Sequence, residues 1–371
     1  MNKLYCFNQD NNINNLIAIH HYNCDHIVII EDKKEKYKNI DGLNSYLQDK
    51  GYSLSLETVN AYSKDAIKNY IQKIRKEDAM FLLPADASVI GYQVMNILLQ
   101  AEIPLAYVED DGDIYEYHHG EFIFISDSTN LDVEDYILSR GGFIKSEASS
   151  LFDDQRMIQL LTFIESHHKE YKHLFQPSRH PSVYSTAFQN PSTIVFLNND
   201  LTMSEKKFLS DLIAHMVAIN LIKQQYTMKN KLIVTFKVTG MRDYLLKTGT
   251  WLEHRLYNLM RKLDADDVEA SLNFVWNNKR SSNNECDVVG VYENTLILAS
   301  CKDTNKLSPD YINEIYVIAE HLGNEESIKI LFTTSNIPEY LIEKGKEFEV
   351  YLVHYNYDEE AALNELKAII Q

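Results

Sequence analysis

The stretch NECDVVGVYENTLILASCKD, residues 284–303, decides how the C-terminal part of the chain folds. Its two apolar runs flank the residues YENT, a pattern that predicts two antiparallel strands joined by a tight turn. Residues two apart on a strand face the same side, so Asp287 shares a face with Glu285, and Ser300 shares one with Lys302. A hairpin of this length places Asp287 opposite the Ser300 end. A carboxylate in an apolar strand is costly unless it is paired, which favours a functional role for Asp287.

The residue types at this end of the hairpin suit metal-assisted hydrolysis of a phosphodiester. A divalent cation polarises the phosphate and acidifies a bound water, and a nearby lysine stabilises the developing charge. Mg²⁺ and Mn²⁺ prefer carboxylate and carbonyl oxygens as ligands. The pattern therefore predicts a divalent-metal site with the candidate ligands Asp287, Glu253, the Cys301 carbonyl and Glu285. The candidate catalytic residues are Asp287, Lys302, Glu253 and Ser300.

Three of these residues also have structural interpretations. Thr250-x-x-Glu253 is a capping box, which would use the Glu253 carboxylate to satisfy the start of a helix. Glu285 is compatible with a solvated or salt-bridged strand edge, and Lys302 with a strand that ends at the surface. Both interpretations remain open for each residue.

The hairpin belongs to a small α/β fold with a mixed sheet, predicted over residues 246–371. Helical and strand signals alternate there as helix, three strands, helix, strand, helix, strand and terminal helix. The predicted segments are 250–263, 271–277, 286–292, 295–301, 308–322, 328–333, 337–345, 348–354 and 358–370.

Residues 1–140 predict a Rossmann-like domain. Continuous apolar strands, such as HIVII at 26–30 and AMFLLP at 79–84, are separated by amphipathic helices, as in a parallel sheet covered on both faces. Ligands of such sheets bind beyond the carboxyl ends of the strands. The candidate ligand-binding residues are therefore those of two loops: Asn8, Gln9, Asp10, Asn11, Ala85, Asp86, Ala87 and Ser88. Neither loop is a GxGxxG, and both are also compatible with ordinary polar loops that cap helices.

Residues 141–245 differ in character from both flanks and predict a mostly helical connecting module. Helices are expected over 150–175 and 201–225, the second opened by the capping box Thr202-x-x-Glu205. An irregular segment with a short strand, STIVFL at 192–197, lies between them.

The composition sets limits on function. The chain has 371 residues with 36 basic and 54 acidic side chains, a net charge of −18. This disfavours a simple basic-surface binder of nucleic acid, so a polyanion would need a local basic groove or metal ions. The four cysteines form no CxxC pair, which is typical of reduced thiols. The sequence has no secretory signal and no apolar run that would span a membrane, so we expect a cytoplasmic protein.

The hairpin pattern D-x(12)-S-x-K, with a helical glutamate upstream, resembles the PD-(D/E)XK nuclease superfamily. The segments TGTWLE at 248–253 and NECD at 284–287 are similar to nucleases fused behind a CRISPR-associated Rossmann fold (CARF) domain. The loop after the first strand, NQDNNINNL at 8–16, fits the same architecture. The resemblance implies a CARF homodimer that senses cyclic oligoadenylate, and a nuclease that cuts DNA or RNA with Mg or Mn in CRISPR-linked antiviral defence.

Two departures from the family pattern bear on activity. Ser300 stands where the family has a glutamate, so a metal ligand is missing unless another acid, such as Glu285 or Asp303, replaces it. The second loop, Pro84-Ala85-Asp86-Ala87-Ser88, lacks the family's glycines, threonines and lysine, and Asp86 would repel a phosphate.

Two functions follow from these observations. The first is a nucleotide-gated, metal-dependent nuclease. The second is a catalytically decayed homodimer that senses a ligand and signals by contact. Residues 248–371 hold 11 basic and 22 acidic residues, a net charge of −11, which favours the second. A basic groove, expected from Arg255, Arg261, Lys262, Lys279 and Arg280, would favour the first.

Overall fold

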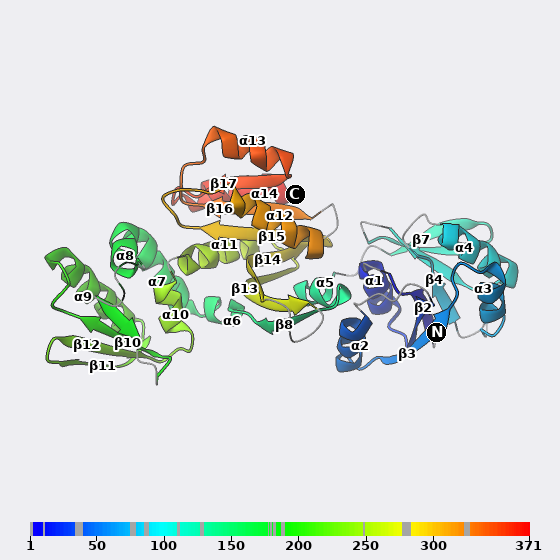
Figure 1. Ribbon diagram of the computed structural model, residues 1–371, viewed down its shortest axis with the longest axis horizontal. Coiled ribbons are helices and arrows are strands. Elements are labelled where there is room, and N and C mark those ends of the chain that lie inside the picture. The colour runs from blue at the N-terminus through cyan, green and yellow to red at the C-terminus, as the bar shows by residue number, and fades with distance from the viewer. Residues whose placement is uncertain are drawn as a thin grey trace.

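Figure 1 presents the computed structural model of the chain, an elongated molecule whose described residues form three β-sheets. The structure describes residues 3–371 except 10–11, 34–39, 75–78, 85–88, 110–111, 127–129, 177, 179, 181–182, 187–189, 248, 277–282 and 323–326. No helix within these residues combines the length and apolarity needed to cross a bilayer.

The N-terminal sheet has the strand order β3-β2-β1-β4-β5-β6-β7, parallel from β3 to β5 and antiparallel at β6 and β7. Its strands are β1 (Lys3–Phe7), β2 (His26–Asp32), β3 (Ser53–Val59), β4 (Ala79–Leu82), β5 (Leu105–Val108), β6 (Ile114–His118) and β7 (Glu121–Ser126). The helices are α1 (Ile13–Tyr22), α2 (Ile40–Asp49), α3 (Lys64–Ile71), α4 (Val89–Ala101) and α5 (Val133–Ser139). Buried apolar clusters lie on both faces of the sheet, which explains why its inner strands are apolar throughout. The predicted Rossmann-like domain is confirmed.

The middle of the chain contains more sheet than predicted. Its strands β9 (Tyr184–Thr186), β10 (Thr193–Leu197), β11 (Ile222–Met228) and β12 (Lys231–Phe236) form an antiparallel sheet in the order β11-β12-β10-β9. Its helices are α6 (Ser149–Phe152), α7 (Gln155–Ser166), α8 (His168–Phe175), α9 (Met203–Ala218) and α10 (Met241–Leu246).

The helix predicted over 201–225 is too long. The capping box of Thr202 and Glu205 does open α9, but the helix ends at Ala218 and residues 222–228 form a strand. Asn220 takes the left-handed conformation, with φ of 62°, which a helix interior does not allow. Tertiary pairing of β11 with β12 therefore decides this boundary.

The C-terminal sheet has the order β17-β16-β15-β14-β13-β8. Its strands are β8 (Gly142–Ser146), β13 (Asp267–Trp276), β14 (Asn284–Tyr292), β15 (Thr295–Lys302), β16 (Ile328–Thr333) and β17 (Val350–His354). The helices α11 (Thr250–Lys262), α12 (Asp310–Leu322), α13 (Glu339–Glu347) and α14 (Glu359–Ile370) accompany it. The mixed α/β fold predicted for this region is confirmed. Strand β8, however, comes from the segment expected to connect the domains, and pairs with β13.

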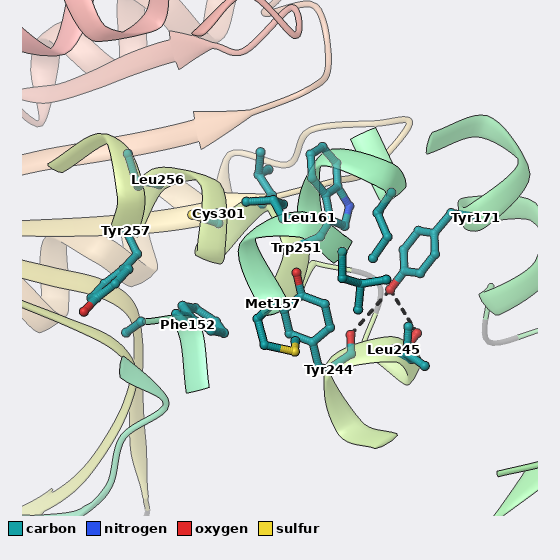
Figure 2. Close-up of a cluster of buried hydrophobic side chains, with 14 of the residues drawn as sticks. Phe152, Met157, Leu161, Tyr171, Tyr244, Leu245, Trp251, Leu256, Tyr257 and Cys301 are labelled. Carbon is teal, nitrogen blue, oxygen red and sulfur yellow. Dashed lines mark hydrogen bonds between the residues drawn. The ribbon is translucent and has the colours of Figure 1, made fainter. Parts of the chain in front are cut away.

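Two hydrophobic cores connect these parts. One core joins the middle of the chain to the α11 side of the C-terminal sheet, with Phe152, Tyr171, Tyr244 and Trp251 buried together (Figure 2). The Tyr171 hydroxyl donates to the Leu245 carbonyl at 2.9 Å inside it. The other core joins the N-terminal domain, through α5, to the opposite side of the same sheet.

Candidate active site

The hairpin of β14 and β15 has the register that its sequence predicts. Tyr292 pairs with Thr295, and the two turn residues Glu293 and Asn294 both have positive φ, 45° and 57°. This is the backbone twist of a type I′ turn, which fits a two-residue hairpin. The register brings Asp287 beside the end of β15.

Three groups from the end of β15 converge on one oxygen of Asp287. The backbone N–H of Cys301 donates to Asp287 Oδ2 at 2.7 Å, and the Ser300 hydroxyl donates to the same atom at 3.2 Å. The Lys302 ammonium lies 3.5 Å from it. The other oxygen, Oδ1, accepts no hydrogen bond from the described residues. The sequence prediction that Asp287, Ser300 and Lys302 lie together is thus realised in the fold.

A small cavity opens beside this group, with about 60 Å³ of free volume. It is lined by Asp287, Ser300 and Lys302 together with two further acids, Glu285 and Glu314. A cavity of this size has room for several water molecules. Glu314 lies on α12, and no local pattern indicates its position at the cavity, because it belongs to an ordinary amphipathic helix.

Lys302 is held in its charged form. Burial lowers its pKa, but the carboxylates of Asp287 and Glu314 more than offset this, and the net shift is upward. Its ammonium also lies 5.2 Å from the centre of the Tyr311 ring, a cation–π distance. Lys302 is therefore a fixed positive charge at the wall of the cavity.

Glu253 lies near Asp287 but does not line the cavity. Its carboxylate accepts a hydrogen bond from the Ser271 hydroxyl at 2.5 Å, and Ser271 has a left-handed φ of 47°. Burial and the nearby Asp287 carboxylate raise the Glu253 pKa to about 8. The side-chain cap predicted from Thr250-x-x-Glu253 is not formed, because α11 begins at Thr250 and Gly249 occupies the N-cap position.

Two other acids have partners that define their roles. Glu285 is exposed and forms an ion pair of 3.5 Å with Lys247. Asp303, which the sequence offered as a replacement ligand, accepts from Lys172 at 2.8 Å, Trp251 at 3.1 Å and Thr334 at 2.8 Å. Its carboxylate is buried by these contacts, so it anchors the end of β15 and is not available as that ligand.

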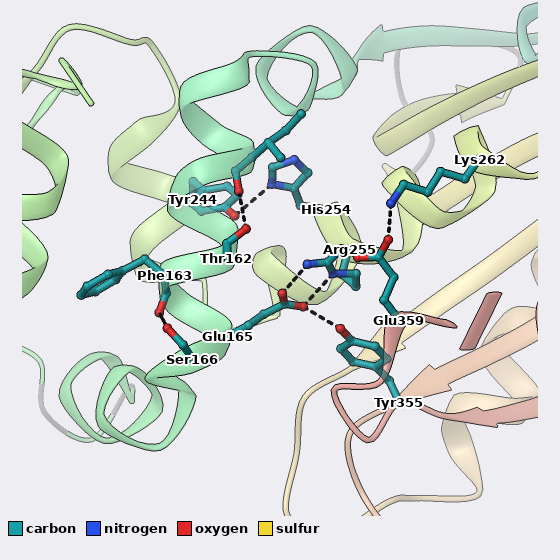
Figure 3. Close-up of polar contacts among 11 residues, drawn as sticks. Thr162, Phe163, Glu165, Ser166, Tyr244, His254, Arg255, Lys262, Tyr355 and Glu359 are labelled. Atoms are coloured by element: carbon teal, nitrogen blue, oxygen red, sulfur yellow. Dashed lines mark hydrogen bonds and ion pairs between the residues drawn. The ribbon is translucent and has the colours of Figure 1, made fainter. Parts of the chain in front are cut away.

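The expected basic groove is not formed by its described members. The Arg255 guanidinium binds Glu165 through two N–H groups and Glu359 through a third, and Lys262 pairs with Glu359 (Figure 3). Tyr355 donates to Glu165 at 2.9 Å in the same network. Arg261 lies over the Tyr257 ring, and Lys279 and Arg280 fall outside the described residues. Arg255 and Lys262 therefore hold α11 against its neighbours, Arg255 against both α7 and α14 and Lys262 against α14.

The donor set at the hairpin suits a hard divalent cation. Asp287 has a free carboxylate oxygen, and Glu285 and Glu314 add carboxylates around the same cavity. Within the described residues, however, no three side chains of His, Cys, Asp or Glu already lie in a ligating arrangement. These residues therefore fit a cation that keeps several water ligands, as Mg²⁺ does.

The candidate sensor loop at the end of β1 is organised by asparagine amides. Asn12 donates to Asn8 Oδ1 at 3.0 Å, and Asn15 donates to the Phe7 carbonyl at 2.8 Å. Asn8 is buried, and its amide nitrogen has no hydrogen-bond partner among the described residues. Gln9 adjoins this group through its N–H, which donates to Asn12. The remaining predicted residues, Asp10, Asn11, Ala85, Asp86, Ala87 and Ser88, lie outside the described residues.

The class of the C-terminal part follows from its sequence. Residues 241–342, which include α11 and the hairpin, match the family model of the Card1-like endonuclease domain. No curated protein is similar enough in sequence to count as a match for the chain.

Solved structures define the fold of the whole chain. Can2 from Sulfobacillus thermosulfidooxidans, in complex with cyclic tetra-adenylate, matches with a TM-score of 0.67 at 15% identity, covering 100% of both chains. Protein VC1899 from Vibrio cholerae matches with a TM-score of 0.72 at 16% sequence identity, and the match covers 99% of this chain and 97% of VC1899. A type III CRISPR defence DNA nuclease activated by cyclic oligoadenylate matches with a TM-score of 0.53 at 10% sequence identity. This match covers 98% of the present chain and 51% of that nuclease. The predicted fold of the whole chain, a Rossmann-like domain fused to a smaller α/β domain, is thereby confirmed, and the family model adds that this second domain is of endonuclease type.

Proposed function

We propose that the chain is a nuclease activated by cyclic oligoadenylate, dependent on Mg or Mn, that hydrolyses phosphodiester bonds of DNA or RNA in CRISPR-linked defence. The observation that carries this proposal is the Asp287–Lys302 pair at the wall of a cavity. The pair lies inside the residues that match an endonuclease domain. The likeness of the whole chain to Can2, solved with cyclic tetra-adenylate, supports the nature of the activator.

The residues of the cavity have distinct roles in this proposal. Asp287 and the Cys301 carbonyl would hold the cation, with Glu285 from the cavity wall or Glu253 from beside the cavity as a further ligand. Lys302 would donate to the phosphate or to the attacking water. When bound, the cation would polarise the phosphate and lower the pKa of a bound water. Ser300 keeps Asp287 oriented through its hydroxyl. Of the acids able to replace the family's glutamate, Glu285 and Glu314 line the cavity.

The sensor in this proposal is the end of the N-terminal sheet where β1 and β4 lie side by side. From β1 the chain continues to β2 on one side of the sheet, and from β4 it continues to β5 on the other side. Open α/β sheets bind ligands at such a switch point. Asn8 and Gln9 stand there, followed in sequence by Asp10 and Asn11. The buried amide nitrogen of Asn8 offers a neutral donor to a phosphate. In a homodimer, two such loops would face one cyclic ligand across the two-fold axis.

The test is a cleavage assay on labelled single-stranded and double-stranded DNA and RNA with Mn²⁺, across cyclic oligoadenylates of different ring size. Wild type should cleave only with one ring size present, and Asp287→Ala should not cleave. Light scattering should show a dimer at micromolar concentration. Cleavage that survives in Asp287→Ala would place the active site elsewhere in the chain.

A second function is favoured by one observation. The glutamate position holds Ser300, and Asp287 Oδ2 is already saturated by Cys301, Ser300 and Lys302. A closed pair of this kind needs no metal, as expected of a decayed nuclease that senses a ligand and signals by contact. Ligand binding without cleavage of any substrate, in wild type and in Ser300→Glu, would select this alternative.

A further inference from the structure

The acidic charge of the chain is not spread evenly. Residues 212–242 contain no aspartate or glutamate, although the chain as a whole has 54 acids in 371 residues. The same stretch holds four lysines, Lys223, Lys229, Lys231 and Lys237, and ends at Arg242. It folds as the second half of α9 followed by the β11–β12 hairpin. A locally positive hairpin on a protein of net charge −18 is a feature that the proposed catalytic site does not use.

The lysines of this hairpin are exposed and uncompensated. All of β11 beyond Ile222 is exposed, because it is the edge strand of the middle sheet. Lys223, Lys229 and Lys231 have no ion-pair partner within the described part of the chain, and Lys237 donates only to the neutral side chain of Asn220. One acid, Asp200, lines the shallow hollow next to the hairpin turn. The positive potential of the hairpin therefore reaches solvent.

An exposed aromatic side chain stands among these charges. Tyr226 is 46% exposed and Met228 is 55% exposed, and both project from β11. Tyr226 pairs with Ile233, which places it on the sheet face opposite to the one that buries Val234 in the core. Lysines beside a solvent-facing aromatic ring form the combination that holds single-stranded nucleic acid, with phosphates on the cations and a base on the ring.

Two lysines of the middle of the chain, outside its sheet, also bind the cavity end of the C-terminal sheet. Lys172 of α8 binds Asp303, the residue directly after Lys302. Lys247, directly after α10, forms an ion pair with Glu285 at the start of β14. The part of the chain that carries the hairpin thus contacts β14 and the residue that directly follows β15.

We propose that the β11–β12 hairpin holds the backbone of a single-stranded nucleic acid and so supplies the positive surface that the nuclease-type domain lacks. This inference rests on the proposed function. It also explains how so acidic a nuclease-type domain could bind a polyanion. Residues 248–371 have a net charge of −11, and two of the five cations expected to line a basic groove, Arg255 and Lys262, are paired with acids. The contacts are to phosphate and to one stacked base, so binding depends little on sequence.

Binding of short fluorescent oligonucleotides to the full-length protein tests the proposal, measured by anisotropy over a range of salt concentrations in EDTA, which prevents cleavage. The variant Lys223→Gln/Lys229→Gln/Lys231→Gln removes three charges from the hairpin. A matched control, Lys64→Gln/Lys68→Gln/Lys73→Gln, removes three exposed charges around α3 and gives the same net charge. The slope of log K against log salt for single strands should fall by about 2 in the hairpin variant, because each phosphate contact contributes about 0.7.

The control should keep the wild-type slope and affinity. Tyr226→Ala should weaken binding of single strands by about fivefold or more while leaving the salt slope unchanged, because a stacked base carries no charge. Equal slopes for the hairpin variant and wild type would overturn the proposal, as would hairpin-dependent binding that is tighter for a duplex than for a single strand.

A parallel cleavage assay separates this inference from the proposed function. Hairpin-dependent binding without cleavage under any condition would contradict the nuclease and leave the binding surface intact. Full cleavage by the hairpin variant at subsaturating substrate would overturn the binding surface and leave the nuclease intact.

Discussion

Two regions of the molecule present polar groups at the ends of strands, but they differ in charge. The end of β1 is lined by neutral asparagine amides, with Asn8 buried and its amide nitrogen free. The end of β15 is lined by full charges, with Asp287 against Lys302 and two further acids around the cavity. Neutral hydrogen-bond donors can bind an anion that already carries its charge. Fixed charges also stabilise the new charge that develops in the transition state of a reaction. The difference suits the first region to recognition and the second to chemistry.

The largest effect should come from removing the fixed cation of the charged region. Lys302→Ala should lower the rate of cleavage by about a thousandfold, because the developing negative charge loses its partner in a confined site. Metal binding, followed by calorimetry with Mn²⁺, should be largely kept. The exposed Lys306→Ala serves as the matched control and should cleave at the wild-type rate. A Lys302→Ala protein that cleaves normally would break the comparison, since the charged region would then not be the reacting one.

Glu165→Gln tests whether the charged region depends on the middle of the chain. The substitution leaves the Arg255 guanidinium with Glu359 as its remaining acidic partner, and should cost about 2 kcal/mol of unfolding free energy, less than for a buried ion left with no partner. Thermal and urea unfolding would measure this. Glu170→Gln, on the exposed side of α8, should change stability by under about 0.5 kcal/mol. A loss as small as that of the control would mean that Arg255 does not hold α11 in place.

Asn8→Asp tests the neutral region. The new side chain keeps the acceptor oxygen that Asn12 uses, but replaces the free N–H donor with a negative oxygen. Affinity for cyclic tetra-adenylate should fall tenfold or more, because a carboxylate repels phosphate at this buried position. Calorimetry gives the affinity, and Asn69→Asp on the exposed face of α3 controls for the change in net charge. Unchanged affinity would remove Asn8 from the binding site.

The smallest effect is expected at the residue that departs from the family pattern. Ser300→Glu should lower the Mn²⁺ concentration needed for half-maximal cleavage by about fivefold, since a further hard anionic ligand would face the cavity beside Asp287. Ser300→Gln, of similar size but neutral, should not have this effect. If the glutamate variant needs as much metal as wild type, the acids already present complete the metal site.

The hairpin site could be predicted because its geometry is local. The alternation of apolar residues and the two-residue turn fix which side chains meet, so Asp287, Ser300 and Lys302 could be brought together without knowledge of the rest of the fold. The Rossmann-like domain was predictable for a similar reason, since buried parallel strands are apolar along their whole length.

Features that depend on distant pairing could not be predicted in this way. Strand β8 joins the C-terminal sheet through β13, more than a hundred residues later in the chain. Glu314 reaches the cavity because α12 packs on the sheet, and Asp303 is occupied because α8 lies against the end of β15. The sequence around each of these residues is compatible with several environments, and only the packing of separate elements selects one.

The two hydrophobic cores have a consequence for how the chain loses its structure. Val288 belongs to the core shared with the middle of the chain, whereas the next residue, Val289, belongs to the core shared with the N-terminal domain. Strand β14 therefore separates the two cores and contributes side chains to both of them. Neither core can unfold without exposing one face of this strand to solvent. On heating, the three sheets should come apart in one cooperative transition, unlike domains strung on a flexible linker, which unfold one at a time.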